Sequence, residues 1–290
     1  RLLTKQWDVV LVDEVSMLLL PMTYFVAGKA TKRVILVGDF LQLPAIISSD
    51  QENKHVAEWV KADPFRKWHV TDPKVRQDNP PSVFVGLREQ NRMHDQICQL
   101  ISQSFYKRWL ITGARAKGRT FDGPSIGKTS KRVLWIDTSE LDVWSSKRYG
   151  KGSLFNITHA ALVGEIVDTL AAKGYFQGKN ADNKDNTLGV VTPYAAQQEL
   201  ISTLLEPVKH YVPVDYVGTA HKFQGDEKDT IIVDMVEASS KPSRFINAES
   251  YDDDAGRLLN VGLSRAKEFL IVIVNKQAFD LGGSRFMQQL

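Results

Sequence analysis

The stretch FLIVIVN, residues 269–275, is an almost unbroken run of Val, Ile and Leu. Such a run has no polar side, so it predicts a strand that is buried on both faces. Five further runs have the same character: residues 7–14, 33–39, 132–137, 187–193 and 230–236. Strands of this kind occur in parallel sheets that are covered by helices, and the sequence therefore predicts an α/β fold.

Helical patterns lie between these strands. The apolar residues of 93–105 share one face of a helix, and residues 160–170 repeat the pattern. Asn156 stands before the second helix, where its side chain is expected to cap a free backbone N–H group. Cys98 lies in the first helix, and we expect a packed thiol rather than a reactive one.

Length and composition are those of an ordinary globular protein. The 290 residues suffice for one large or two ordinary domains, and 43% are hydrophobic and 24% charged. The net charge of +3 does not decide the kind of partner. One cysteine excludes an intrachain disulfide, and the six histidines lack the spacing of a zinc site. No apolar run approaches the ~20 residues of a membrane span, so we predict a cytoplasmic protein, or a nuclear one in a eukaryote.

The stretch 106–130 is the least apolar part of the chain, and we place a domain boundary in it. Residues 1–120 then form a first domain and residues 121–290 a second. Only two predicted strands fall in the first domain, so we expect that domain to be incomplete. Six basic residues surround the boundary: Arg115, Lys117, Arg119, Lys128, Lys131 and Arg132. A charge run is more often a solvated surface, and the other interpretation is a patch that attracts a polyanion.

The stretch DGPSIGKTS, residues 122–130, is similar to a phosphate-binding loop. That loop reads G-x-x-x-x-G-K-[ST], leaves a buried strand and begins a helix. Here only three residues separate Gly123 from Gly127, and an apolar run that predicts a strand follows. We therefore interpret the stretch as a turn near the domain boundary.

Two acids, Asp13 and Glu14, directly follow the first predicted strand. Ligands of open parallel sheets bind at the carboxyl ends of the strands, so this position favours a functional role. An Asp there can hold Mg²⁺, and the neighbouring Glu can orient or deprotonate a water in phosphoryl transfer. The other interpretation is an acidic turn that caps the following segment, and the two acids alone do not decide between them.

Five motifs follow in order: VGDFLQLPAI (37–46), LREQNRMHDQI (87–97), VVTPYAAQQELI (190–201), VGTAHKFQGDEKDTIIVDMV (217–236) and LLNVGLSRAKEFLIVI (258–273). Together with VVLVDEVSM after the first strand, the series resembles superfamily 1 helicases, in particular the branch of the up-frameshift RNA helicases and their bacterial DNA/RNA relatives. The resemblance extends from residue 7 to about residue 275. It implies RecA-like P-loop NTPase domains that bind ATP and Mg²⁺ and move along single-stranded DNA or RNA.

The resemblance implies roles for five residues near the phosphates. Asp13 would be the Mg²⁺ ligand and Glu14 the catalytic carboxylate that polarises water. Gln42 would reach the γ-phosphate and the water, because an amide can donate and accept at once. Arg92 and Arg265 would meet the γ-phosphate from the first and second domains. The other interpretations are a polar loop residue for Gln42 and a surface ion pair for Arg265.

Further nucleotide contacts are implied for FQGDEKD. It supplies Gln224, Gly225 and Glu227, and the resemblance places Glu227 near the ribose, while Gly225 permits a close backbone approach. Glu227 has the alternative role of a surface partner for a nearby cation. Asn91 stands where family members usually carry a Tyr that stacks on the base, and Asn cannot stack.

Single-stranded nucleic acid would contact loops that follow the strands of the second domain. The resemblance implies backbone contacts by five residues: Thr192, Pro193, Tyr194, Thr219 and His221. Small hydroxyls suit such a grip, because phosphate contacts position a strand without reading its sequence. Tyr194 as a core aromatic residue and His221 as a buried hydrogen-bonding residue are the other interpretations.

In the family a phosphate-binding loop precedes the position of Asp13, and the twelve residues before Asp13 contain none. We therefore expect this chain to be the C-terminal part of a larger helicase and, by itself, to hydrolyse ATP poorly or not at all. The alternative function is a non-hydrolysing nucleic-acid-binding or interaction module that retains the helicase fold. The complete set of catalytic residues argues against it, since a binding module has no need of them.

Overall fold

The computed structural model describes residues 4–45, 59–60, 62, 64–72, 74–75, 81–119, 131–150, 152–180, 182, 184–208, 214–238, 243, 246–282 and 285–290. The chain divides into two compact units, a first unit of residues 1–87 and a second unit of residues 88–290. The stretch 122–130, interpreted as a turn, lies outside the described residues, and so does the predicted boundary between residues 120 and 121.

Two parallel strands form the sheet of the first unit. The elements of this unit are β1 (Trp7–Val12), η1 (Val15–Met17), α1 (Leu20–Ala27), β2 (Ala30–Leu36) and α3 (Pro64–Lys67). Val12 packs in a small buried core with Val15 and Phe65. The alternate residues Val9 and Leu11 are 51% and 60% exposed. The prediction of strands buried on both faces is therefore wrong for β1. It is also wrong for β2, where Val34 and Ile35 are 38% and 39% exposed, and for the predicted strand 132–137, where Trp135 is 40% exposed.

Five parallel strands form the main sheet of the second unit. In spatial order they are β5 (Val133–Asp137), β11 (Ala266–Val274), β10 (Lys228–Asp234), β8 (Leu188–Thr192) and β9 (Val214–Thr219). All but β9 were expected from their apolar runs. The sequence of β9, VDYVGT, interrupts its apolar residues with Asp and Gly and so offers no such run. The predicted α/β class is confirmed.

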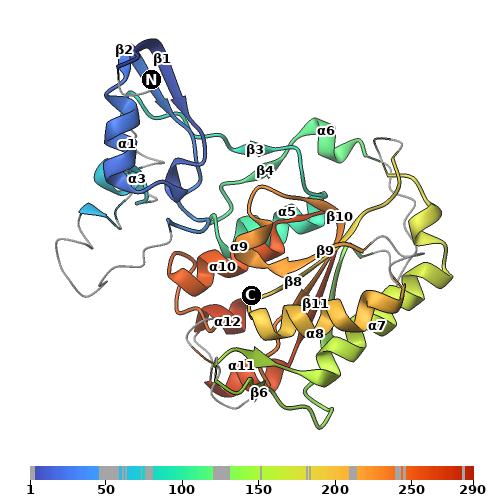
Figure 1. The fold of residues 1–290 in the computed structure, drawn as a ribbon. Coiled ribbons are helices and arrows are strands. Elements are labelled where there is room, and N and C mark those ends of the chain that lie inside the picture. Colours follow the sequence, from blue (N-terminus) through green and yellow to red (C-terminus); the bar gives the residue numbers. More distant parts are fainter. Residues whose placement is uncertain are drawn as a thin grey trace. The chain divides into compact units, whose positions relative to one another are not determined.

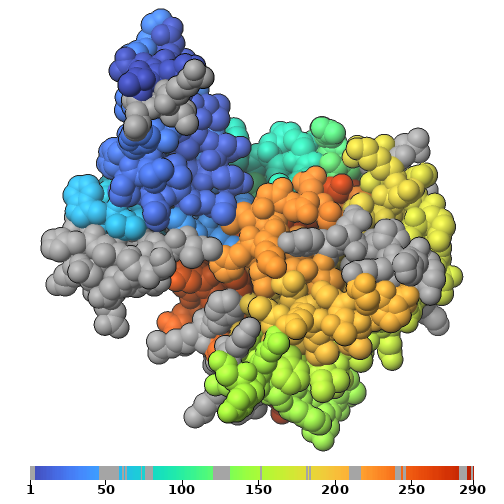
Figure 2. Space-filling model, in the orientation of Figure 1, coloured from blue at the N-terminus to red at the C-terminus, as the bar shows by residue number. Residues whose placement is uncertain are grey.

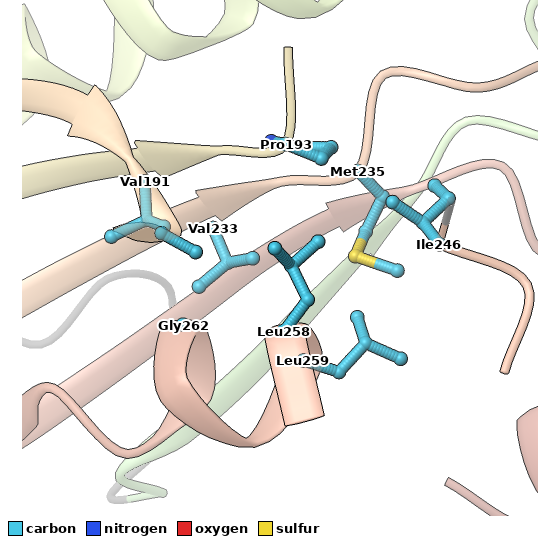
Figure 3. Close-up of a pocket in the computed structure, with 9 residues that line it drawn as sticks. Val191, Pro193, Val233, Met235, Ile246, Leu258, Leu259 and Gly262 are labelled. Atoms are coloured by element: carbon cyan, nitrogen blue, oxygen red, sulfur yellow. The ribbon is translucent and has the colours of Figure 1, made fainter. Parts of the chain in front are cut away.

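Helices cover both faces of this sheet (Figure 1). Val190 and Ile232 pack in the core under α7 (Ile157–Ala172) and α8 (Ala195–Leu205). The next residues along the same strands, Val191 and Val233, point to the opposite face. There they meet α9 (Ala220–Phe223) and α10 (Asp254–Leu263), as Figure 3 shows for α10. Alternate residues thus face opposite cores, which explains the absence of a polar side in β8 and β10.

The remaining elements of the second unit are short or lie at its rim. They are β3 (Glu89–Gln90), α5 (Asp95–Ser104), β4 (Ile111–Thr112), α6 (Ala114–Lys117), β6 (Ser146–Lys147), β7 (Leu154–Phe155), η2 (Tyr175–Gln177), η3 (Glu206–Val208), α11 (Lys276–Gly282) and α12 (Arg285–Gln289). Cys98 is buried in α5, as predicted. Across the described residues, no helix has both the length and the apolar character that crossing a membrane requires.

Residues 88–119 belong to the second compact unit. The His94 N–H donates to the Lys267 carbonyl at 2.6 Å, and the Arg132 N–H donates to the side chain of Gln96 at 2.8 Å. The unit therefore begins before the predicted boundary, because α5 contacts β11 of the main sheet. Which of the two RecA-like domains residues 88–119 belong to stays a prediction.

A buried polar network lies at the carboxyl ends of β5 and β10. His159 Nδ1 lies 2.9 Å from Asp234 Oδ1, and His159 Nε2 lies 2.9 Å from the hydroxyl of Thr138. Gln197 of α8 donates to Asp234 at 2.6 Å. The side chain of Asn156 accepts the His159 N–H at 3.0 Å, which confirms the predicted cap of α7. Because each of these polar groups finds a partner, their burial is not penalised, and the network joins α7 and α8 to the strand ends.

Candidate nucleotide and nucleic-acid sites

The predicted Mg²⁺ ligand and catalytic carboxylate form a tight turn after β1. Glu14 has φ 50° and ψ 40°, the left-handed conformation that is uncommon for residues other than glycine. Its N–H donates to Asp13 Oδ1 at 2.9 Å, and the next N–H, of Val15, donates to the Val37 carbonyl at 2.9 Å. Such strain occurs where the surrounding structure over-determines a residue, and functional sites are the common location.

Gln42 is held by a residue of its own motif. Its side-chain N–H donates to Asp39 Oδ2 at 3.0 Å, while Asp39 Oδ1 accepts the Leu41 N–H at 2.9 Å. The amide oxygen of Gln42 is thereby oriented away from Asp39, since the nitrogen faces the carboxylate. The sequence did not identify Asp39, although its spacing of three residues from Gln42 was visible.

The loop that carries Arg92 is closed by the side chain of Gln90. Gln90 Oε1 accepts the N–H groups of Arg92 and Met93 at 2.9 and 2.7 Å, and its Nε2 donates to the Met93 carbonyl at 2.9 Å. The His94 N–H then donates to the Lys267 carbonyl and ties the end of the loop to β11. Arg92 therefore projects from a loop whose backbone is fixed on both sides.

Arg92 and Glu227, predicted to contact the same nucleotide, form an ion pair. Arg92 Nε lies 2.6 Å from Glu227 Oε2, and their side chains are 36% and 42% exposed. The alternative role of Glu227, a partner for a nearby cation, is thus observed in this structure. Nucleotide contact by either residue stays a prediction.

Gln224 and Gly225 lead into the strand that follows Glu227. Both amide atoms of the Gln224 side chain are buried and lack a hydrogen-bond partner among the described residues. Gly225 has φ 84°, which favours glycine. A buried amide without a partner is costly, so Gln224 is suited to a ligand that can both donate and accept.

Arg265 lies between the end of α10 and the start of β11, and it is almost wholly buried. Its Nε donates to the Val261 carbonyl at 3.0 Å and one Nη to the Ser264 hydroxyl at 3.2 Å. Its own carbonyl accepts the Lys228 N–H at 3.1 Å. The alternative of a surface ion pair does not fit this buried side chain, and the guanidinium contacts its own helix.

The segments that carry Glu227 and Arg265 are joined by a buried carboxylate. Asp229 accepts hydrogen bonds from the Asn180 side chain at 3.0 Å and from the N–H and hydroxyl of Thr187 at 2.9 and 2.8 Å. Lys267 Nζ lies 3.1 Å from its other oxygen. Burial alone would raise the pKa of Asp229. The hydrogen bonds and the Lys267 ammonium lower that pKa by more than burial raises it, so the net pKa lies below its ordinary value.

Asp229→Asn is expected to lower the stability of the protein at neutral pH by about 3 kcal/mol, because it leaves the Lys267 charge unpaired beside a buried site. A carboxyl with a lowered pKa stabilises the fold above its unfolded pKa of about 4, and this contribution is lost as the pH falls through the folded pKa. Urea unfolding midpoints of wild type and variant should therefore differ most above pH 5 and converge below pH 4. Asp185→Asn, in an exposed pair with Lys179, is the control and should change little at any pH. A constant difference across this pH range would contradict the assignment.

The residues predicted to bind single-stranded nucleic acid lie at the opposite edge of the main sheet from the residues predicted to bind nucleotide. Glu227 and Arg265 directly precede β10 and β11, whereas Thr192 and Thr219 end β8 and β9 and are paired in register. Because all five strands are parallel, the starts of β10 and β11 and the ends of β8 and β9 lie at opposite edges. The length of the strands thus separates the predicted nucleotide-binding residues from the predicted nucleic-acid-binding residues.

Burial distinguishes the members of the strand-binding set. Thr192 is fully buried, and its hydroxyl has no partner among the described residues. The hydroxyl of Tyr194 bonds Glu237 and lies 2.7 Å from the Ser243 hydroxyl, and burial together with Glu237 raises its pKa. Tyr194 thus matches the alternative of a core aromatic residue. His221 on α9 is exposed, so its alternative as a buried residue does not hold. Residues coloured orange, the part of the sequence to which α9 belongs, form part of the visible surface in Figure 2.

Pro193 lines an apolar pocket between the sheet and α10 (Figure 3). Its neighbours there include Val191, Met235 and Leu258. Pro193 therefore supports the packing of its loop in this structure. Contact of Pro193, Thr192 and Thr219 with single-stranded nucleic acid stays a prediction.

Two protein-family models, both described as an AAA domain, match the chain over residues 74–277 and residues 1–50. The chain is 25% identical over 297 residues to the DNA polymerase alpha-associated DNA helicase A of Saccharomyces cerevisiae, covering 97% of this chain and 40% of that protein. It is 27% identical over 274 residues to the ATP-dependent helicase upf1 of Schizosaccharomyces pombe, covering 92% and 26%. Among solved structures, arterivirus nonstructural protein 10, a helicase, matches with a TM-score of 0.42 at 14% identity, covering 96% of this chain and 42% of that chain.

The chain spans 40% or less of the length of these two relatives. The AAA-domain model over residues 74–277 covers more than half of the chain, and the relatives are named as helicases, one of them upf1. The chain therefore belongs to the superfamily 1 helicases, in their up-frameshift-like branch.

Proposed function

We propose that this chain is part of the motor core of an ATP-dependent superfamily 1 helicase that couples ATP hydrolysis to movement along single-stranded DNA or RNA. The observation that carries the proposal is the arrangement of the second unit. The starts of β10 and β11 lie beside Glu227, its ion-pair partner Arg92 and the Arg265 backbone. Thr192 ends β8 and Thr219 ends β9. A motor needs phosphate-binding groups and nucleic-acid-binding groups on one rigid body, because a change of contacts at one site then moves the other site.

The first unit would supply oxygen ligands and the groups that orient water. Asp13 is exposed in the turn after β1, so its carboxylate is accessible to an ion. This fits Mg²⁺, which is usually held by one or two carboxylates together with phosphate oxygens and water. When bound, Mg²⁺ neutralises charge on the phosphates.

Glu14 and Gln42 would act on the attacking water. Glu14 can accept a proton or a hydrogen bond from the water, and its left-handed backbone sets the direction of its side chain. Gln42 is anchored through its nitrogen to Asp39, and an amide can donate and accept hydrogen bonds, which suits a group that orients the water. Both groups then hold the water in line for attack on the γ-phosphate.

The second unit would supply positive charge. A phosphate would compete with Glu227 for the Arg92 guanidinium, and Arg265 would exchange its contact with the Val261 carbonyl for the γ-phosphate. These cations neutralise charge that develops on the transferred group. Once the γ-phosphate has left, both guanidinium groups can return to their protein partners, so the second unit changes its contacts once in each cycle.

The test is the ATPase activity of the full-length protein, with and without single-stranded DNA or RNA. We expect hydrolysis that requires Mg²⁺ and is stimulated by single strands, together with ATP-dependent displacement of one strand of a tailed duplex. Comparing 5′ and 3′ tails checks the 5′ to 3′ movement that the family branch implies. Tight strand binding without hydrolysis would support the non-hydrolysing module instead.

A further inference from the structure

Arg119 lies in the basic stretch that sequence favours as a solvated surface, yet only 14% of its side chain is exposed. One Nη donates to the Arg92 carbonyl at 2.6 Å, and the other donates to the Asn91 carbonyl at 2.8 Å. The first nitrogen also lies 3.5 Å from Glu268 Oε1 on β11. Its guanidinium thus bridges the backbone of the Arg92 loop to a central strand of the main sheet.

The segment that carries Arg119 is built against the same loop. β4 pairs in parallel with β3, which precedes the loop, and the Gly113 N–H donates to the Gln90 carbonyl at 2.8 Å. A Cβ atom at Gly113 would lie 2.4 Å from the side-chain oxygen of Asn91, so any other residue at this position would require the Asn91 side chain to move. Gly118 then ends α6 and turns the chain towards Arg119. The position of Arg119 is therefore set by the segment that precedes it.

The chemistry of the bridge requires an arginine. A guanidinium presents its donors in a rigid fork, so two nitrogens can reach two successive carbonyls while one of them faces a carboxylate. A lysine ammonium can retain the charge beside Glu268 but lacks the planar fork. Glu268 is only 2% exposed, and burial raises its pKa, so a fixed cation beside it also stabilises its charged form.

We propose that Arg119 is a positioning residue for hydrolysis: it fixes the Asn91–Arg92 backbone to β11 and thereby sets where the Arg92 guanidinium lies. This inference rests on the proposed function of Arg92. The other ties of the loop come from Gln90, whose side chain accepts the N–H groups of Arg92 and Met93, and from Gly113 and Lys267, which hold its two ends. Arg119 alone among these bonds the carbonyl of Arg92 itself. Loss of Arg119 therefore removes the contacts of both carbonyls that flank Arg92, and leaves these two peptide groups held only through their N–H bonds to Gln90.

The experiment compares the full-length wild type with Arg119→Gln, Arg119→Lys, Arg92→Ala and the Arg92→Ala/Arg119→Gln double variant. Strand-stimulated kcat, KM for ATP, affinity for a single strand and thermal melting are measured for each. Arg119→Gln should lower kcat about tenfold to a hundredfold, the effect of a displacement of about 1 Å, with KM and strand affinity near wild type. Arg148→Gln, which removes an arginine of an exposed ion pair with Glu199, is the control and should keep the wild-type kcat.

The other variants distinguish a positioning role of Arg119 from a purely structural role. Arg119→Lys keeps a charge beside Glu268, so it should melt near wild type yet lose kcat, even if Arg119→Gln does not fold. In the Arg92→Ala background, Arg119→Gln should cause no further loss of kcat, because it acts through Arg92. A wild-type kcat in Arg119→Lys, or independent losses in the double variant, would overturn the inference.

Failure of the inference can be distinguished from failure of the proposed function. If the wild type hydrolyses ATP, Arg92→Ala does not, and Arg119→Lys and Arg119→Gln both keep the wild-type kcat, the role of Arg119 alone is wrong. If the wild type does not hydrolyse ATP, or Arg92→Ala keeps its full rate, the proposed function of Arg92 is wrong and the inference falls with it.

Discussion

Arg265→Ala in the full-length protein is expected to lower the strand-stimulated ATPase rate by about 10³ to 10⁵, the effect of removing an arginine finger in related NTPases. Single-strand affinity should be retained, because the predicted strand contacts Thr192 and Thr219 lie at the opposite edge of the sheet. The measurements are steady-state ATP hydrolysis and fluorescence anisotropy with a labelled single strand. Retained turnover would count against the role of Arg265.

Burial of Arg265 makes a control for folding necessary. The side chain is 1% exposed and bonds the Val261 carbonyl and the Ser264 hydroxyl, so alanine leaves a cavity as well as removing a charge. Arg265→Lys fills most of that space and keeps the charge but lacks the fork, and we expect a rate between those of wild type and alanine. If Arg265→Lys melts at the same temperature as the wild type but has a lower ATPase rate, the loss of rate is due to the missing guanidinium.

Glu14→Gln in the full-length protein is expected to lower the ATPase rate by about 10² to 10⁴, since it removes the group that accepts a proton or hydrogen bond from the attacking water. Glutamine has nearly the same shape and the same backbone preference, so the left-handed turn at Glu14 should persist. ATP affinity, measured by equilibrium binding in the presence of Mg²⁺, should remain near wild type.

The control for Glu14 is an acid on the strand that precedes it. Asp8 lies in β1, pairs with Lys32 and is 68% exposed, so Asp8→Asn should leave the rate unchanged. If Asp8→Asn and Glu14→Gln reduce the rate equally, a general effect of charge on the first unit explains the loss, and the catalytic role of Glu14 is contradicted.

The central part of the fold was predictable because it depends on neighbours in sequence. The apolar runs of β8, β10 and β11 are buried on both faces, and the one-sided patterns of α5 and α7 match their buried faces. The same rule failed for β1, whose runs are equally apolar but whose alternate residues are exposed. A run of apolar residues states a preference for burial, and only the surrounding elements decide whether it is satisfied.

The candidate site was predictable only as a set of residue types. The motif order singled out Arg92 and Glu227, but not that they form an ion pair across 135 residues of chain. It placed Arg119 in a charge run and Tyr194 in a strand-binding loop, whereas Arg119 bridges two carbonyls to Glu268 and Tyr194 bonds buried Glu237. These differences arise because a charged or aromatic side chain follows whichever partner the fold brings to it.

The sequence by itself determined the α/β class, four of the five strands of the main sheet, the Asn156 cap and the membership of the helicase family. Each of these depends on residue types at short spacing or on the order of motifs. Only the tertiary structure decided which edge of the sheet each motif occupies, that Arg92 pairs with Glu227, and that Arg119 holds the Arg92 loop. Those features are contacts between residues distant in the chain, and their energies depend on distance, burial and orientation, which the order of residues does not contain.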